Sequence, residues 1–84
     1  MVIYVYMLRS LKDKKFYTGC TEDLKKRLKQ HNSGMVRSTK ARRPFELVYW
    51  EPLGTRSEAM KRERQLKSFG RDVKLELARS FERV

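Results

Sequence analysis

The sequence is poor in several features that define whole classes of protein. It has a single cysteine among 84 residues, which excludes a framework of internal disulfides and a zinc site built from cysteines. This scarcity is consistent with a reducing cytoplasm, where we expect the protein to reside. No run of about 18 apolar residues exists, so we expect no membrane-spanning helix. The apolar residues 1–8 follow no basic segment and precede no small-residue cleavage site, so we interpret them as a strand and not as a signal peptide.

Acidic residues are also few beside the basic ones. Lys and Arg total 21 and Asp and Glu total 10, which gives a formal net charge of +11. Clustered cations bind phosphates and release condensed counterions, so this excess favours a nucleic acid as partner, with DNA preferred over RNA. An anionic membrane surface and a role in solubility alone are the alternatives, and we expect no membrane partner because aromatic and β-branched residues supply a folded core.

The length of 84 residues predicts one small domain that covers the whole chain. Residues 2–9 alternate and are rich in β-branched and aromatic side chains, and both faces are covered, so they should form a central strand. Residues 11–15 indicate a polar hairpin loop around Asp13. Residues 16–20 should then form a second, antiparallel strand.

The remaining elements are predicted from caps and breakers. Thr21 should cap a helix that runs to about Asn32, with Gly34 as its stop. Residues 34–43 indicate an exposed basic loop, and Pro44 should begin a third strand that ends at Pro52 and Gly54. Thr55 and Glu58 have capping-box spacing ahead of a helix over about 57–69, and Asp72 should cap a last helix at about 71–82. This order predicts an α+β fold, a small three-stranded sheet flanked by helices.

Two side chains of the first helix are candidates for phosphate chemistry. Leu24 and Leu28 should face the core, and Arg27 and His31, also four apart, should lie beside that stripe. A guanidinium there can hold a phosphate and stabilise charge that develops on it. The alternatives are an arginine that snorkels over the sheet and an ordinary histidine at a helix end.

The second long helix carries a carboxylate in an unexpected place. Ala59, Met60, Leu66 and Phe69 should form its inward face, and Glu63 lies on that stripe. Carboxylates are rarely buried without a partner, so Glu63 should either pair with an arginine or hold a divalent cation. Mg²⁺ commonly takes one or two protein carboxylates and completes its shell with water and phosphate oxygens.

The tyrosines of the first two strands are the remaining candidates. Tyr4 and Tyr6 share a face of the first strand, and Tyr17 lies on the next strand. Aromatic residues in strands usually belong to the core. A tyrosine acts as a base at neutral pH only with help, which a nearby Mg²⁺ or Arg27 can supply.

Together these residues resemble the GIY-YIG nuclease domain, in its short stand-alone form. The motifs are Tyr4-Val5-Tyr6, Tyr17-Thr18-Gly19, Arg27, His31 and the Ala59-x-x-x-Glu63 element, and the resemblance covers about residues 2–69. It implies a three-stranded antiparallel sheet flanked by helices and a one-metal mechanism of phosphodiester hydrolysis.

The resemblance also implies roles. Tyr17 would be the general base or would orient water, with Tyr6 as an alternative or helper. Arg27 would stabilise the attacked phosphate, and His31 would assist by a hydrogen bond to a tyrosine or to phosphate. Glu63 would hold Mg²⁺ or Mn²⁺. Cys20 stands where some active relatives carry a lysine that assists proton transfer, which leaves the identity of the base open.

The expected function is therefore a Mg²⁺-dependent DNA endonuclease of low sequence specificity, with repair or recombination as its setting. One alternative is a nucleic-acid-binding module of the same fold without efficient cleavage. The basic loop would contact nucleic acid in either case, through Arg37, Lys40, Arg42 and Arg43. Another alternative is an adaptor that recruits a partner through its helical face.

Overall fold

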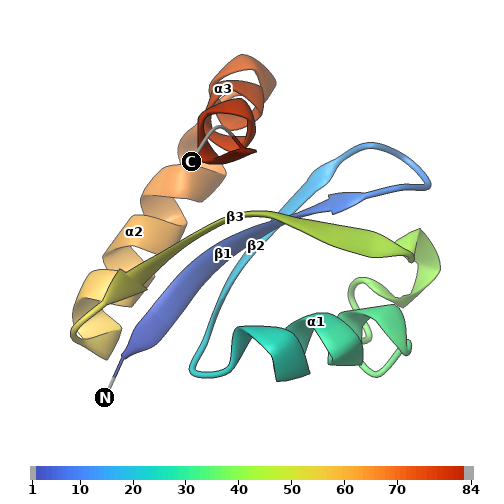
Figure 1. The fold of residues 1–84 in the computed structure, drawn as a ribbon, viewed down its shortest axis with the longest axis horizontal. Coiled ribbons are helices and arrows are strands. Elements are labelled where there is room, and N and C mark those ends of the chain that lie inside the picture. Colours follow the sequence, from blue (N-terminus) through green and yellow to red (C-terminus); the bar gives the residue numbers. More distant parts are fainter. Residues whose placement is uncertain (1, 83–84) are drawn as a thin grey trace.

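The structure, a computed structural model, describes residues 2–82. Its elements follow the predicted order (Figure 1), with a short 3₁₀ helix, η1, added before the third strand. They are β1 (Ile3–Ser10), β2 (Phe16–Thr21), α1 (Leu24–Asn32), η1 (Lys40–Arg42), β3 (Phe45–Leu53), α2 (Arg56–Ser68) and α3 (Arg71–Glu82). The predicted α+β fold class is confirmed.

The three strands form one antiparallel sheet in the order β2-β1-β3. The central position predicted for β1 is confirmed, and its Val5 and Met7 are completely buried. In the register of the sheet, Tyr6 lies between Gly19 of β2 and Trp50 of β3. One central strand therefore places a tyrosine next to a glycine on the edge strand.

Helices cover both faces of the sheet (Figure 1), α1 on one side and α2 and α3 on the other. Alternation along β1 divides its side chains between the two faces. Tyr6 and Leu8 pack with Phe45 against the leucines of α1. Ile3 and Val5 pack with two buried residues of α2, Ala59 and Leu66.

Some predicted caps are in different places. Thr21 still belongs to β2, where it pairs with Tyr4, so it does not cap α1. Asp23 is the cap, and its carboxylate accepts a hydrogen bond from the Lys26 amide at 3.1 Å. Asp72 lies inside the first turn of α3, because that helix already begins at Arg71.

Other predicted helix signals are confirmed. Thr55 caps α2, because its hydroxyl accepts from the Glu58 amide at 3.1 Å. The same hydroxyl donates to the Glu58 carboxylate at 3.0 Å, so the carboxylate contacts the cap hydroxyl and not the cap amide that a full capping box uses. Gly34, after the end of α1, has a φ of +84°, a backbone conformation that glycine adopts without strain.

Met60 was predicted to face inward, and this is wrong. Its relative exposure is 53%, whereas Ala59 and Leu66 are 1% and 0% exposed. Ala59 and Leu66 are about two turns apart and define the buried stripe, and Met60 lies one residue, about 100° of rotation, away from Ala59.

The segment at 34–43 is more ordered than the exposed loop that was predicted. It contains η1, and its Thr39 is completely buried. Among residues 2–82, no helix has the length and apolar character needed to cross a membrane.

Candidate active site

Three of the predicted catalytic residues meet between β1 and α1. The Tyr6 hydroxyl lies 2.9 Å from Nε2 of His31. Nε of Arg27 donates to the same hydroxyl oxygen at 3.3 Å. The helical spacing of Arg27 and His31 brings both to one tyrosine, as predicted for side chains beside the leucine stripe of α1.

Gly19 makes room for this arrangement. It lies opposite Tyr6 in the sheet, and a Cβ at this position would be 2.6 Å from the Tyr6 hydroxyl oxygen. The glycine of the second tripeptide is therefore needed for the close approach of the tyrosine of the first tripeptide.

A chain of hydrogen bonds fixes the protonation of His31. Its Nδ1 lies 2.8 Å from the Thr39 hydroxyl, which in turn donates to the carbonyl of Val36 at 3.4 Å. The Thr39 hydroxyl therefore accepts from Nδ1, and Nε2 accepts from Tyr6. His31 is completely buried, and burial, with the nearby charge of Arg27, lowers its pKa from 6.5 to about 4. His31 is thus neutral at physiological pH.

Tyr6 is poorly suited to be the base. Burial raises its pKa to about 12, although the hydrogen bond from Arg27 works in the opposite direction. Its proton is donated to His31, and its oxygen already accepts from Arg27. Through these contacts Tyr6 holds the side chains of Arg27 and His31 in place.

Tyr17 occupies a more accessible position on β2. Its side chain is half-buried, and its ring lies 5.0 Å from the His31 ring and 6.4 Å from the Tyr6 ring, measured between centroids. Arg27 is close to both tyrosines, and its pKa is raised first by the hydrogen bond to Tyr6 and further by Tyr17. Tyr17 is therefore the tyrosine of the cluster better placed to meet a substrate.

An open pocket of about 380 Å³ adjoins the cluster. Arg27, Lys26 and Arg56 bring positive charge to it, and Arg27 is also held by its Nη1 donating to Gln30 at 3.2 Å. The other lining residues are Cys20, Thr21, Glu22, Asp23 and Gln30. A phosphate group in this pocket would meet the guanidinium that contacts Tyr6.

Glu63 belongs to α2, which packs on the face of the sheet opposite to α1. Its Oε1 accepts from the Cys20 thiol at 2.8 Å and its Oε2 forms an ion pair with Lys67 at 2.7 Å. Burial opposes ionisation, but these hydrogen bonds prevail and the pKa of Glu63 is lowered. The carboxylate is therefore charged. Burial and the Glu63 hydrogen bond raise the pKa of the Cys20 thiol to about 12, so Cys20 is a protonated donor.

The side chains around Glu63 decide whether the divalent metal that the family resemblance implies can bind there. Among residues 2–82, no group of three or more His, Cys, Asp or Glu side chains comes together as a metal cluster. A single ionised carboxylate with 24% side-chain exposure is nevertheless sufficient for Mg²⁺, which fills its shell with water and phosphate oxygens. Glu63 fits such an ion on the condition that Lys67 gives up its ion pair.

Cys20 connects the two parts of the site. It contacts Glu63 on one side and lines the pocket beside Arg27 on the other. Two contributors were missed from the sequence. The Glu63–Lys67 pair has the (i, i+4) spacing of helical ion pairs, which could have been noticed, whereas nothing local indicated that Thr39 contacts His31.

The four predicted nucleic-acid contacts divide into two kinds. Arg37, Lys40 and Arg43 are exposed. Arg42 is partly buried, forms an ion pair with Asp13 at 3.0 Å and lies over the Phe45 ring at 5.7 Å. Its guanidinium is used to hold the fold.

The protein is a small α+β domain, a three-stranded antiparallel sheet with a tyrosine–arginine–histidine cluster on one face and a carboxylate on a helix of the other face. The GIY-YIG catalytic domain matches residues 2–76. The chain belongs to this family, and the resemblance noted in the sequence is confirmed.

Relatives of known sequence and structure have similar length. A UPF0213 protein of Staphylococcus saprophyticus is 47% identical over 75 residues, which cover 88% of this chain and 90% of the relative. A UPF0213 protein of Haloquadratum walsbyi is 41% identical over 76 residues, covering 89% and 84%. The solution NMR structure of a UPF0213 protein from Bacillus halodurans superposes with a TM-score of 0.56 at 40% identity, covering 92% of this chain and 82% of that one.

Proposed function

We propose that the protein is a divalent-metal-dependent endonuclease that hydrolyses DNA phosphodiester bonds with low sequence specificity. The observation that carries this proposal is the chain of contacts from Arg27 through Tyr6 to His31, beside an open pocket. Three cations, Arg27, Lys26 and Arg56, and two carboxylates, Glu22 and Asp23, line this pocket. The net charge of +11 supports a nucleic acid as substrate. We place this activity in the cytoplasm, in repair or recombination.

In this mechanism each residue has a distinct task. Arg27 binds a non-bridging phosphate oxygen and stabilises the charge that grows on it during attack. Tyr17, after releasing its phenolic proton to solvent, orients the attacking water and accepts a proton from it as the new P–O bond forms and the bond to the leaving oxygen breaks, and solvent protonates the leaving oxygen. Tyr6 and neutral His31 hold the guanidinium in place. Mg²⁺ or Mn²⁺ bound at Glu63 would supply stabilisation of the leaving oxygen.

The test is cleavage of labelled duplex, single-stranded, nicked and branched DNA and RNA with Mg²⁺, Mn²⁺ or EDTA. Native protein is compared with Arg27→Ala, Glu63→Ala and a control, Glu76→Gln, at an exposed carboxylate of α3. We expect metal-dependent cutting that falls at least 100-fold in the first two variants, the scale of losing one transition-state contact, and persists in the control. Cutting that survives both changes would contradict the proposal.

A second candidate is a binding module of the same fold without efficient cleavage. This candidate is favoured because Lys67 and Cys20 already contact the two carboxylate oxygens of Glu63. Position 20 is also a cysteine and not a lysine. The binding module predicts salt-dependent binding in the same panel without cutting under any metal condition. Arg27→Ala would then change affinity only slightly.

A further inference from the structure

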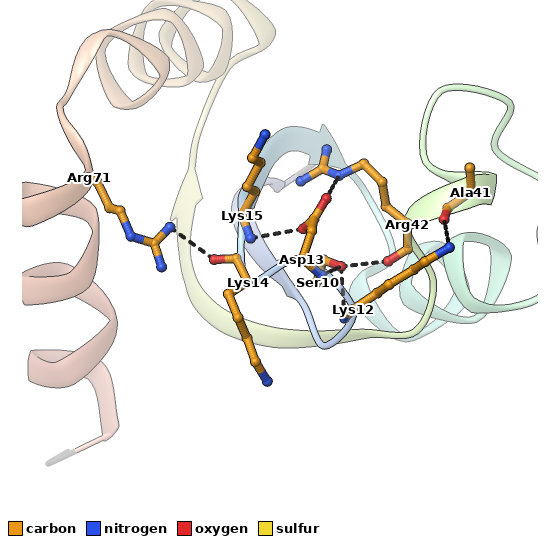
Figure 2. Close-up of polar contacts among 8 residues, drawn as sticks. All are labelled: Ser10, Lys12, Asp13, Lys14, Lys15, Ala41, Arg42 and Arg71. Atoms are coloured by element: carbon orange, nitrogen blue, oxygen red, sulfur yellow. Dashed lines mark hydrogen bonds and ion pairs between the residues drawn. The ribbon is translucent and has the colours of Figure 1, made fainter.

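Three segments that are far apart in the sequence meet at the turn end of the β1–β2 hairpin (Figure 2). They are the hairpin loop at 11–15, η1 and the first residue of α3, and we call this region the hairpin end. Nζ of Lys12 donates to the carbonyl of Ala41 at 3.1 Å. On the other side, Nη1 of Arg71 donates to the carbonyl of Lys14 at 3.0 Å. Figure 2 shows the loop held between these two contacts.

Hydrogen bonds of a buried serine fix the shape of this loop. The Ser10 side chain is completely buried. Its hydroxyl donates to the Arg42 carbonyl at 2.6 Å and accepts from the amides of Lys12 and Asp13, each at 3.1 Å. The loop and η1 are therefore joined as one unit.

The acid of the loop is already used within the fold. Asp13 accepts from the Lys15 amide at 2.9 Å and forms the ion pair with Arg42. These contacts, the Lys15 amide first, lower the pKa of Asp13. Asp13 is thus ionised at neutral pH but is directed toward the backbone of the loop and toward Arg42.

Lys14 and Lys15 serve the fold through their backbones. Their amides donate to Ser10 and Asp13, and their carbonyls accept from Arg71 and Ser10. Both side chains are exposed, and among residues 2–82 neither ammonium group is in an ion pair. A fixed backbone therefore presents two unneutralised charges to solvent.

More positive charge surrounds them. Arg9 and Arg71 both lie over the Phe16 ring, at 5.9 and 5.6 Å from its centroid. The exposed Lys40 and Arg43 continue the charge along the η1 side. So many like charges held close together repel one another, and a polyanion relieves that repulsion.

We propose that the hairpin end is a second phosphate-contact surface, which binds the nucleic-acid backbone beside the phosphate held at Arg27. This inference rests on the proposed function and names a part of the surface that its substrate covers. The hairpin loop precedes β2, and Cys20 and Thr21 at the other end of β2 line the pocket of Arg27. The five residues from Lys15 to Cys20 span about 17 Å of extended strand, an axial length of B-DNA that holds about five phosphates of one strand. The hairpin end therefore contacts phosphates about five nucleotides from the phosphate held at Arg27.

The experiment measures the affinity for a labelled DNA duplex between 50 and 200 mM salt. The variant Lys14→Gln/Lys15→Gln is compared with native protein and with Lys61→Gln/Arg79→Gln, which removes the same charge from exposed sites on α2 and α3. Each lost phosphate contact reduces the slope of log affinity against log salt by about 0.9. We expect a reduction of about 1.8 in the hairpin variant and a change below about 0.5 in the control. Thermal melting verifies that both variants are folded.

The possible outcomes separate the two ideas. Equal slopes for the hairpin variant and the control would overturn this inference and leave the nuclease proposal intact. An altered affinity for anionic lipid vesicles with an unchanged affinity for DNA would also overturn it. Native protein that binds neither DNA nor RNA would overturn the proposed function and this inference together.

Discussion

Replacing Gly19 with alanine tests the central contact of the candidate site. The added Cβ would lie 2.6 Å from the hydroxyl oxygen and 2.8 Å from Cζ of Tyr6. Ordinary contacts of this kind are longer by about 0.8 Å or more, so the ring must move by that amount. Tyr6 is only 2% exposed, and the surrounding core leaves it little freedom to move.

The expected cost has two parts. Overpacking a well-filled core costs about 1–3 kcal/mol. A ring displaced by about 0.8 Å would also lengthen the 2.9 Å contact between Tyr6 and His31 beyond hydrogen-bonding distance. Leaving a buried acceptor without its donor costs about 1–3 kcal/mol more. We therefore expect Gly19→Ala to lower the free energy of unfolding by about 2–6 kcal/mol, or Tm by roughly 10 °C or more.

Gly70→Ala is the matched control, because a Cβ there would meet no atom within 4 Å. Circular dichroism melting curves of both variants and the native protein provide the measurement, and we expect less than about 1 kcal/mol of loss in the control. A Gly19→Ala protein that melts within about 2 °C of native would refute the steric argument. If it melts lower but cleaves normally, Tyr6 is a fold residue and its hydroxyl has no part in holding the site.

Three further outcomes follow from other contacts. The pKa of His31 falls from 6.5 to about 4 on folding, so between these values the unfolded chain binds a proton that the folded chain does not. The free energy of unfolding, measured with urea, should therefore fall by about 2 kcal/mol between pH 7 and pH 5. A free energy that does not change over this range would contradict a buried neutral histidine. Lys67→Gln removes the cation that pairs with Glu63 and should tighten Mn²⁺ binding by calorimetry about tenfold, whereas Lys61→Gln should not; equal affinities would show that the ion pair does not compete. Ser10→Ala leaves three hydrogen bonds of the hairpin loop unmade and should cost about 1–3 kcal/mol in a denaturant melt, a value near zero indicating that water replaces the hydroxyl.

The sequence predicted what short-range periodicity controls. Alternation placed Tyr6 on one face of β1, and four-residue spacing placed Arg27 and His31 beside the leucine stripe of α1. That the three residues share one site was implied by the family resemblance and not by periodicity. Glu63 was recognised because a carboxylate on an apolar stripe is unusual.

What the sequence did not predict depends on tertiary contacts. The Thr39 contact with His31 needs the fold of the 34–43 segment, which has no periodicity. The place of the α1 cap depended on how far β2 pairs with β1, and this ladder extends through Thr21. Met60 was assigned to the wrong face because it lies next to the buried stripe of α2, and a methionine is tolerated in both buried and exposed positions.

β1 contributes both to the core and to the candidate site, and this has an evolutionary consequence. The same strand supplies the innermost core residues and the tyrosine of the site, so mutations in it are removed by selection for folding before selection for catalysis acts. Loss of catalysis is tolerated more easily at Arg27 or Glu63, which lie at partly exposed positions on helices. Descendants that have abandoned catalysis should therefore retain the tyrosine and the glycine beside it and lose the arginine or the glutamate. In this fold we therefore expect Tyr6 and Gly19 to mark ancestry, and Tyr17, Arg27 and Glu63 to mark activity.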